Sequence, residues 1–428
     1  MASKHVPLAL RLKTKDTFFG RLQNIRFIAT GIIATVFRYY WDGPEVPSWD
    51  LRFHVIRNIL RQYLTDSLPH DMPNEQASRI DFGFVADYIA MNNLPSRPLQ
   101  PAAGFNREHD IVLDSQCCVA YNVPHYGLSS KKLEAMAAAD MQAAQLGRPR
   151  SISCQVLLSS QTTRFAKHAA NVDELLAMAP LDPDERVILH FHGGAYCVGE
   201  RSLTHIHIYA QISRTTGLRV FSPNYRLAPR HCFPSQLHDC FSVYSYMIHC
   251  GFKPKNIVLA GDSAGGALAV GVMFLLRDMK LPRPAAVVLI SPWVDATCSG
   301  ESWTRNQGLD YLPALSLDDP FHPTRMFYDA GREFSEQMLN ELRCPLVSPI
   351  FSTNFSGMPP MLIQMGRNEL LHDDIQLFAD SIKQHNPGGA KLSLEVYDNM
   401  PHVFVLFDFA DAAQQAFCSI GRFICANT

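Results

Sequence analysis

The segment Asn256-Ile-Val-Leu-Ala-Gly-Asp-Ser-Ala-Gly-Gly-Ala-Leu-Ala-Val270 places one serine between two glycines, after a strand-like apolar run and before a helix-like one. A chain that passes from strand to helix at Ser263 must turn sharply there. Side chains at Gly261 and Gly265 would collide inside such a turn, so glycine at both positions permits it. The segment therefore predicts a strained corner that presents the hydroxyl of Ser263 as a candidate nucleophile.

A second glycine motif lies upstream, where the strand-like run Arg186-Val-Ile-Leu-His-Phe191 is followed by His192-Gly-Gly-Ala195. Adjacent glycines allow backbone N–H groups to point into open space, where they can bind an oxyanion. We expect the N–H groups of Gly193 and Gly194 to do so, together with that of Ala264, which follows the candidate nucleophile. One glycine motif alone is a modest signal, but both motifs after apolar strands, in this order, are a strong one.

These residues resemble the hormone-sensitive-lipase-like branch of the α/β-hydrolases, which includes microbial esterases and the arylacetamide deacetylases. The resemblance covers roughly the last 250 residues. It rests on motifs in the family's order, which are His192-Gly-Gly-Ala195, Asn224-Tyr-Arg-Leu-Ala-Pro229, Gly261-Asp-Ser-Ala-Gly-Gly266, Ser291-Pro-Trp-Val-Asp295 and Met400-Pro-His-Val-Phe404. It implies an α/β-hydrolase fold with a helical cap. Ala195 departs from the family, which usually has a third glycine there.

The serine needs a base, because its hydroxyl is almost wholly protonated at neutral pH. His402 is the best candidate among 17 histidines. It follows the strand-like run 392–397 by a short loop, so it can lie at the same edge of the sheet as Ser263. The match to the family motif around it gives His402 the same role. We interpret His192 as ordering the oxyanion loop and not as a base.

The acid that orients the base should lie between serine and histidine in the chain. The candidate segment is Met365-Gly-Arg-Asn-Glu-Leu-Leu-His-Asp-Asp374, where the family usually has Asp-Pro-Leu-Arg-Asp. Aligning the leucine and the trailing aspartate places Glu369 on the catalytic aspartate, and this is the assignment we favour. Asp373 is the second candidate. An alignment anchored on Gly366 would instead place Asn368 there and leave the triad incomplete.

Hydrophobic periodicity divides the chain into two parts. Residues 1–150 show helical spacing broken by proline-rich stretches, and we interpret them as an N-terminal helical cap or extension. Residues 151–428 alternate strands and helices, which predicts a catalytic domain with a mostly parallel sheet covered on both faces. A second part of the cap is expected at about 296–350. The predicted strands are 152–158, 186–191, 218–222, 256–260, 285–290, 361–365 and 392–397.

Composition excludes several classes of protein. The chain has 428 residues, with 38 Lys and Arg against 40 acidic residues, so no nucleic-acid partner is expected. The 11 cysteines are scattered, with no pairs at zinc spacing, which favours reduced thiols in the cytoplasm and no metal site. The start of the sequence lacks the pattern of a secretory signal. The oligomeric state is not indicated.

The longest uncharged apolar stretch near the start is 27–37, between Arg26 and Arg38. It is too short to span a bilayer. We expect a cap helix packed over the active site. The alternative is a helix lying in a membrane interface, because residues 1–65 carry ten Lys or Arg against four acidic residues. We favour the cap helix.

The resemblance implies hydrolysis of a carboxylic ester through an acyl-serine, without a metal or organic cofactor. The aromatic-rich cap suggests a bulky apolar ester, while short acyl chains are the default for this branch. A tailoring role in secondary metabolism fits the likeness of the N-terminal extension to fungal members. The alternative is a non-hydrolytic enzyme of the same fold that catalyses cyclisation, condensation or acyl transfer. The only observations that favour it are the departures from the family pattern at Ala195 and around Glu369.

Overall fold

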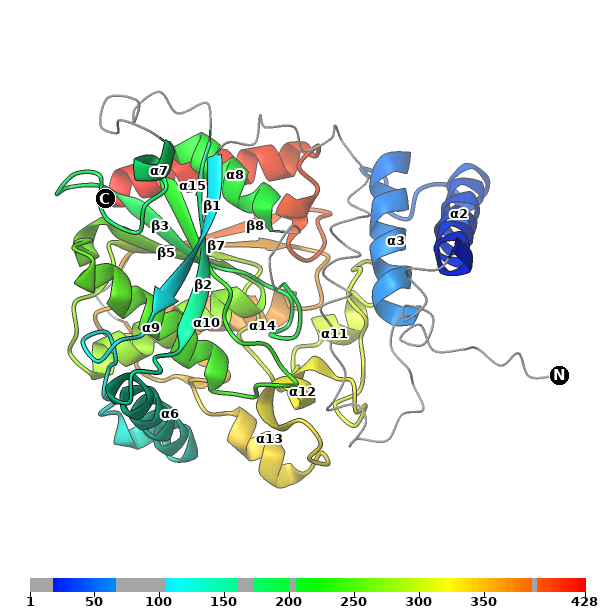
Figure 1. Cartoon of the computed structure of the whole chain (residues 1–428). Helices are drawn as coiled ribbons and strands as arrows, with labels where there is room; N and C mark the ends of the chain where they lie inside the picture. The colour runs from blue at the N-terminus through cyan, green and yellow to red at the C-terminus, as the bar shows by residue number, and fades with distance from the viewer. Residues whose placement is uncertain (1–17, 67–104, 160–171, 200–204, 387–390) are drawn as a thin grey trace.

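The computed structural model describes residues 18–66, 105–159, 172–199, 205–386 and 391–428. Within these ranges eight strands form one sheet in the order β1-β2-β4-β3-β5-β6-β7-β8, seen edge-on in Figure 1. The strand β2 is antiparallel to β1 and β4, and the remaining neighbours are parallel. The strands are β1 (Phe105–Val112), β2 (Ser151–Leu158), β3 (Val187–Phe191), β4 (Arg219–Pro223), β5 (Ile257–Asp262), β6 (Ala286–Ile290), β7 (Met361–Gly366) and β8 (Leu392–Tyr397).

The seven strands predicted from the sequence are all present, and the α/β-hydrolase fold with a mostly parallel sheet is confirmed. Every residue of the central strands β3, β5 and β6 is buried. Such continuous apolar runs are typical of strands with helices on both faces. Residues of α8 (Ile206–Thr216) and α15 (Asp411–Asn427) share one hydrophobic cluster, and those of α9 (Ser235–His249), α10 (Ala264–Asp278) and α14 (His372–Gln384) share the other.

The strand β1 lies before residue 150, where the sequence placed the boundary between cap and catalytic domain. It pairs along its whole length with β2, from Phe105 opposite Leu158 to Val112 opposite Ser151. Most of its side chains are exposed and three of them are charged, as in an edge strand, so the apolar alternation that reveals a half-buried strand is missing. The sheet therefore begins earlier than expected, while the division into cap and catalytic domain stays a prediction.

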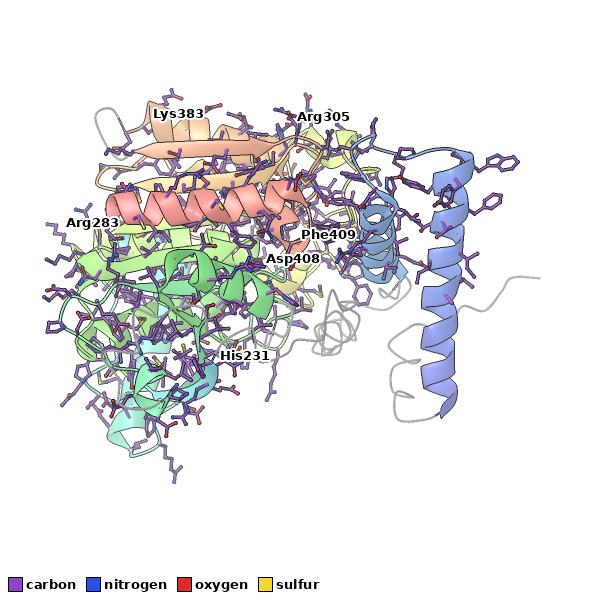
Figure 2. The ribbon with its side chains drawn as sticks, turned by 90° about the horizontal axis from the view of Figure 1, so that it is seen from above. His231, Arg283, Arg305, Lys383, Asp408 and Phe409 are labelled. Atoms are coloured by element: carbon purple, nitrogen blue, oxygen red, sulfur yellow. The ribbon has the colours of Figure 1, made fainter. Side chains whose placement is uncertain are left out.

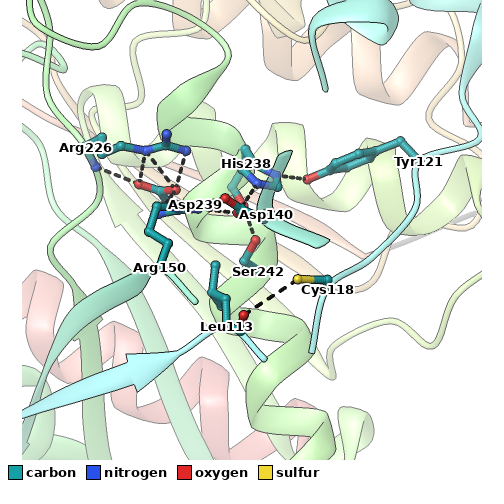
Figure 3. Close-up of polar contacts among 9 residues, drawn as sticks. All are labelled: Leu113, Cys118, Tyr121, Asp140, Arg150, Arg226, His238, Asp239 and Ser242. Atoms are coloured by element: carbon teal, nitrogen blue, oxygen red, sulfur yellow. Dashed lines mark hydrogen bonds and ion pairs between the residues drawn. The ribbon is translucent and has the colours of Figure 1, made fainter. Parts of the chain in front are cut away.

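A partly buried polar network attaches α6 (Leu128–Gln145) to the sheet domain (Figure 3). Arg150 contacts the carboxylates of Asp140 on α6 and Asp239 on α9, at 2.8 and 2.9 Å. Asp239 also pairs with Arg226 at 2.8 Å, and His238 pairs with Asp140 at 2.9 Å. Each buried charge thus has a partner of opposite charge or a hydrogen bond.

Two helices of the N-terminal region lie beside the sheet domain. Figures 1 and 2 show α3 (Leu51–Asp66) between the sheet domain and α2 (Phe18–Trp41). The indole Nε1 of Trp49, just before α3, donates to the carbonyl of Asn399 at 2.5 Å, and the ring of Phe53 stacks on Phe407 at 4.3 Å. The helix α3 is therefore attached to the loop that follows β8. No helix of the described part of the chain is long and apolar enough to cross a membrane.

The remaining helices are short. Besides α7 (Val172–Leu175), the segment 296–350 contains α11 (Ser302–Arg305), α12 (Pro323–Asp329) and α13 (Glu336–Leu342). This segment connects β6 to β7 and lies at the carboxyl edge of the sheet. That edge is where ligands bind in open parallel sheets, so the segment is placed to cover a site there.

Candidate active site

Ser263 occupies the sharp turn that the sequence predicts between β5 and α10. Its backbone has φ 52° and ψ −122°, a conformation that non-glycine residues rarely adopt. A side chain at Gly265 would run into the carbonyls of Phe191 and His192, and one at Gly261 would run into the carbonyl of Gly265. Both glycines are thus required by close backbone approach, and Ser263 is left at the carboxyl edge of the sheet.

His402 lies between the two other residues proposed for the site. Its Nε2 is 2.9 Å from the Oγ of Ser263, and its Nδ1 is 3.0 Å from Oε2 of Glu369. Since a carboxylate only accepts hydrogen bonds, Nδ1–H donates to Glu369 and Nε2 accepts from the serine hydroxyl. All three side chains are buried. The structure therefore brings together the serine, histidine and acid selected from the sequence.

Glu369 is fixed by the turn that follows β7. Its Oε1 accepts the backbone N–H of Gly366 at 3.0 Å. Burial raises the pKa of Glu369 above its usual range, and hydrogen bonds from Ser291 and Gly366 offset only part of that rise. The other candidate acid, Asp373, pairs with Arg305 at 2.6 Å and with Nδ1 of His372 at 2.9 Å. The geometry therefore favours Glu369 over Asp373.

The loop after β3 lies against the serine. A Cβ added to Gly193 would be 3.1 Å from the Cβ of Ser263, and Gly194 has φ 102°. Ala195 has φ 54°, the left-handed region in which glycine is preferred. Ala264 is the first residue of α10, so its N–H has no acceptor within the helix and is available to a ligand. The loop after β3 therefore lies beside the serine turn, and the role of Gly193, Gly194 and Ala264 as oxyanion donors stays a prediction.

His192 contacts the loop and not the serine. Its Nδ1 donates to the carbonyl of Gly193 at 2.7 Å, and its ring stacks on Tyr225 at 4.1 Å. Burial lowers the pKa of His192 to about 3, so it is neutral at physiological pH. These contacts support its interpretation as a residue that orders the loop.

Asp310 is a residue of the site that sequence reasoning missed. Its Oδ1 accepts the backbone N–H of His402 at 3.2 Å, and its Oδ2 accepts that of Leu370 at 2.7 Å. It therefore connects the loop of the base to the loop of the acid. The neighbouring carbonyl of Leu309 accepts from Nε of Arg57 on α3 at 3.3 Å. The only signal in the sequence is an acid between Leu309 and Tyr311, which does not distinguish it from a surface residue.

Opposing effects set the proton affinity of His402. Burial lowers its pKa, while the carboxylates of Asp310 and Asp262 raise it. Asp262 is itself buried, with Oδ2 3.1 Å from Nε2 of His205. The net direction is downward from 6.5, so the imidazole is available as a base at neutral pH.

A cavity of about 210 Å³ opens on Ser263 and His402. Its polar groups are few, and the rest of its surface is apolar. The segment 296–350 contributes Trp303, Tyr311, Leu312, Pro313, His322 and Pro323 to its wall. This segment thus forms part of the cavity wall beside Ser263, and its assignment to a cap stays a prediction.

The helix α3 also contributes to the cavity wall, through Ile56, Leu60 and Leu64. These residues are four apart, so they lie on one face of the helix. The apolar stretch 27–37 was expected to cover the site, but it belongs to α2, and none of its described side chains lines the cavity. The covering helix is therefore α3, since α2 packs on the far side of it.

Comparisons with known proteins agree with the observed fold. Residues 188–406 match the family described as alpha/beta hydrolase fold. The chain is 34% identical over 227 residues to an acetyl-hydrolase from Streptomyces hygroscopicus, covering 53% of this chain and 70% of that one. It is 31% identical over 241 residues to an esterase from Acinetobacter venetianus, covering 56% and 74%. A solved hormone-sensitive lipase from a metagenome library has a TM-score of 0.52 and 28% identity, covering 65% of this chain and 83% of that chain.

Proposed function

The chain belongs to the α/β-hydrolase family, and we propose that it is a serine-dependent carboxylesterase. The observation that carries this proposal is the hydrogen-bonded series Ser263–His402–Glu369, with distances of 2.9 and 3.0 Å. The series ends at the floor of an apolar cavity. The names of the similar proteins, an acetyl-hydrolase and an esterase, support the same reaction.

In the proposed mechanism, His402 removes the proton of Ser263 while the serine oxygen attacks the ester carbonyl. Glu369 holds the imidazole in place and stabilises its cation. The N–H groups of Gly193, Gly194 and Ala264 bind the tetrahedral oxyanion, and each such donor contributes about 3 kcal/mol to transition-state stabilisation. His402 then protonates the leaving alcohol. Water repeats the cycle and releases the acid, so the reaction needs no metal or organic cofactor.

The cavity supports a small-molecule ester with an apolar body. Trp293 and Trp303 lie on its wall together with the aliphatic residues of α3. Apolar walls bind apolar substrate groups because contact removes both surfaces from water. A cavity of about 210 Å³ accommodates a short acyl chain, and a bulkier alcohol would extend toward its opening. A tailoring role in secondary metabolism stays a prediction.

Non-hydrolytic chemistry has no specific support. The sequence favoured it only through the departures from the family pattern at Ala195 and around Glu369. In the structure Ala195 adopts the backbone conformation that a glycine would, and Glu369 reaches His402 at 3.0 Å. Neither departure removes a group that hydrolysis requires.

We also propose a cytoplasmic location. All 11 cysteines are free, including the adjacent pair Cys117 and Cys118. Reduced thiols suit a reducing compartment. Burial and the carboxylate of Asp114 raise the pKa of Cys117 to about 12, so this thiol is protonated and unreactive.

The proposal is tested with p-nitrophenyl esters of increasing acyl length, using Ser263→Ala as the control. The wild-type protein should release p-nitrophenol in repeated turnovers, with the highest kcat/KM for short acyl chains. Ser263→Ala should lose at least a thousandfold of kcat. Turnover by Ser263→Ala at the wild-type rate would rule out the proposed nucleophile.

A further inference from the structure

The helix α2 presents apolar side chains on two faces. Its inner face packs on α3, where the ring of Tyr39 contacts His54 edge-on at 5.2 Å and the hydroxyl of Thr35 accepts from the amide of Asn58 at 3.3 Å. An amphipathic helix of a soluble domain would have polar residues on the opposite face. In α2 that face is apolar as well.

The outward face consists of Ile33, Phe37, Tyr40 and Trp41. Their exposed fractions are 68%, 64%, 75% and 78%. They follow one another at helical spacing, and the rings of Phe37 and Trp41 stack at 5.7 Å. No comparable run of exposed large apolar side chains occurs within one helix elsewhere in the described ranges. Such a contiguous patch indicates an interaction surface.

The sequence up to the end of this face is basic, although two exposed acids, Asp42 and Glu45, follow it directly. The helix α2 contains three arginines and no acidic residue. Residues 1–41 carry seven Lys or Arg and one acidic residue, a net charge of +6. The remainder of the chain carries 31 basic and 39 acidic residues, a net charge of −8. The positive charge of the protein is therefore concentrated in the segment that includes the exposed apolar face.

We propose that the outward face of α2 binds the surface of an anionic lipid bilayer, with the helix lying in the plane of the interface. Trp and Tyr are the side chains that favour this depth, where the ring is in an apolar layer and its polar atom is hydrated. Arg38 on the same half of the helix is exposed and can contact lipid headgroups. Each basic residue near such a surface strengthens binding roughly fivefold.

This arrangement places the active site close to the lipid. The helix α3 packs on the inner face of α2 and lines the cavity through Ile56, Leu60 and Leu64. The cavity wall is thus separated from the bilayer by the thickness of about one helix, on the order of 10 Å. A water-insoluble ester dissolved in the membrane would have a short path to Ser263. The proposed binding is independent of the proposed ester hydrolysis.

The test is flotation of the full chain with two kinds of vesicle, one of phosphatidylcholine and phosphatidylserine in equal amounts and one of phosphatidylcholine alone. The wild-type protein should float with the first and much less with the second. The variant Phe37→Ser/Trp41→Ser should bind the mixed vesicles at least about tenfold more weakly, because it lacks the two aromatic side chains that the bilayer would bury. The matched control is Leu146→Ser/Leu377→Ser, and it should bind like the wild type. Leu146 directly follows α6 and is 68% exposed, and Leu377 lies on α14 and is 57% exposed.

Two readouts keep the test decisive. Both double variants should hydrolyse soluble p-nitrophenyl acetate at the wild-type rate, since none of the four residues lines the cavity. Sedimentation without lipid should show the same oligomeric state for the wild-type protein and for Phe37→Ser/Trp41→Ser. The result that would count against the proposal is a wild-type dimer that the double variant does not form. Such a dimer would assign the face to a second copy of the chain and overturn the proposal. Absence of flotation, or flotation equal for wild type and Phe37→Ser/Trp41→Ser, would also overturn it.

Discussion

The two sides of the cavity, one formed by the sheet domain and one by α3, differ in how precisely their side chains must be positioned. On the sheet side, Ser263, His402 and Glu369 are joined by hydrogen bonds of 2.9 and 3.0 Å. Moving one of these side chains by about 1 Å would break a hydrogen bond of the series. On the α3 side, Ile56, Leu60 and Leu64 offer only apolar surface. The sheet side supplies the chemistry and α3 supplies shape. Substitutions should therefore affect kcat on the first wall and substrate preference on the second.

The largest effect is expected for Glu369→Gln. The amide keeps the shape of the side chain but removes the charge that stabilises the imidazolium, so kcat should fall by about 10⁴ while KM changes little. Steady-state kinetics with a p-nitrophenyl ester measure both constants. Asp373→Asn is the control, and it should lower kcat by less than about threefold because Asp373 pairs with an exposed arginine. A severe loss in Asp373→Asn with a mild one in Glu369→Gln would reverse the assignment of the acid.

A smaller loss is expected for Asp310→Asn. The amide can accept only one of the N–H groups of Leu370 and His402 through its oxygen, so the two loops should lose their fixed separation. An unsatisfied buried N–H costs about 1–3 kcal/mol, which predicts a kcat lower by roughly 10- to 100-fold. Asp318→Asn, at an exposed acid of the same segment, serves as the control.

The pH profile of Asp310→Asn distinguishes positioning from general destabilisation. His402 acts as a base only when neutral, so kcat/KM rises with pH through the pKa of His402. The carboxylate of Asp310 raises that pKa, and removing its charge should lower it. The acidic limb of the profile should therefore move to lower pH. A limb that stays in place, or moves upward, would contradict the account.

A change of shape on the other wall should alter preference among substrates. Leu60→Trp places a larger ring in the cavity of about 210 Å³. We expect kcat/KM for a long acyl ester to fall on the order of tenfold, while that for the acetate ester stays within a factor of about two. Kinetics with the two esters provide an internal control. An equal loss for both would show that α3 acts on the chemistry and not on shape alone.

The smallest effect is expected for Ala195→Gly. Glycine would relieve a φ of 54°, which costs a non-glycine residue about 1 kcal/mol, but it also loses about 0.5–1 kcal/mol through chain entropy. The free energy of unfolding should change by less than about 0.5 kcal/mol. Thermal unfolding measures it. A stabilisation well above that range would show that the loop after β3 is under strain.

The strands predicted from the sequence include the buried central strands, whereas the strand that was missed, β1, is mostly exposed. The central strands β5 and β6 are buried on both faces, so their residues had to be apolar and their ranges could be predicted. The edge strand β1 is mostly exposed, and its apolar residues do not alternate with polar ones. Its position is decided by pairing with β2, which is a contact between distant residues that local periodicity does not encode.

The site divides in the same way. Ser263 and His402 were found because their turns require particular neighbours, such as Gly265 packed against the carbonyl of Phe191. Asp310 was missed, because its partners are backbone N–H groups 60 and 92 residues away, and any sequence can supply these. The lining residues of α3 were not selected either, since their pattern is that of any helix with one buried face.

The central claim is that Ser263 is the nucleophile, and covalent labelling tests it most directly. A fluorophosphonate should modify the wild-type protein with one equivalent of probe, because the serine attacks phosphorus as it would attack an ester carbonyl. Peptide mapping by mass spectrometry should place the adduct on Ser263, and labelling should be slow in Glu369→Gln and absent in Ser263→Ala. An adduct on another residue, or no adduct in protein that turns over esters, would contradict the account.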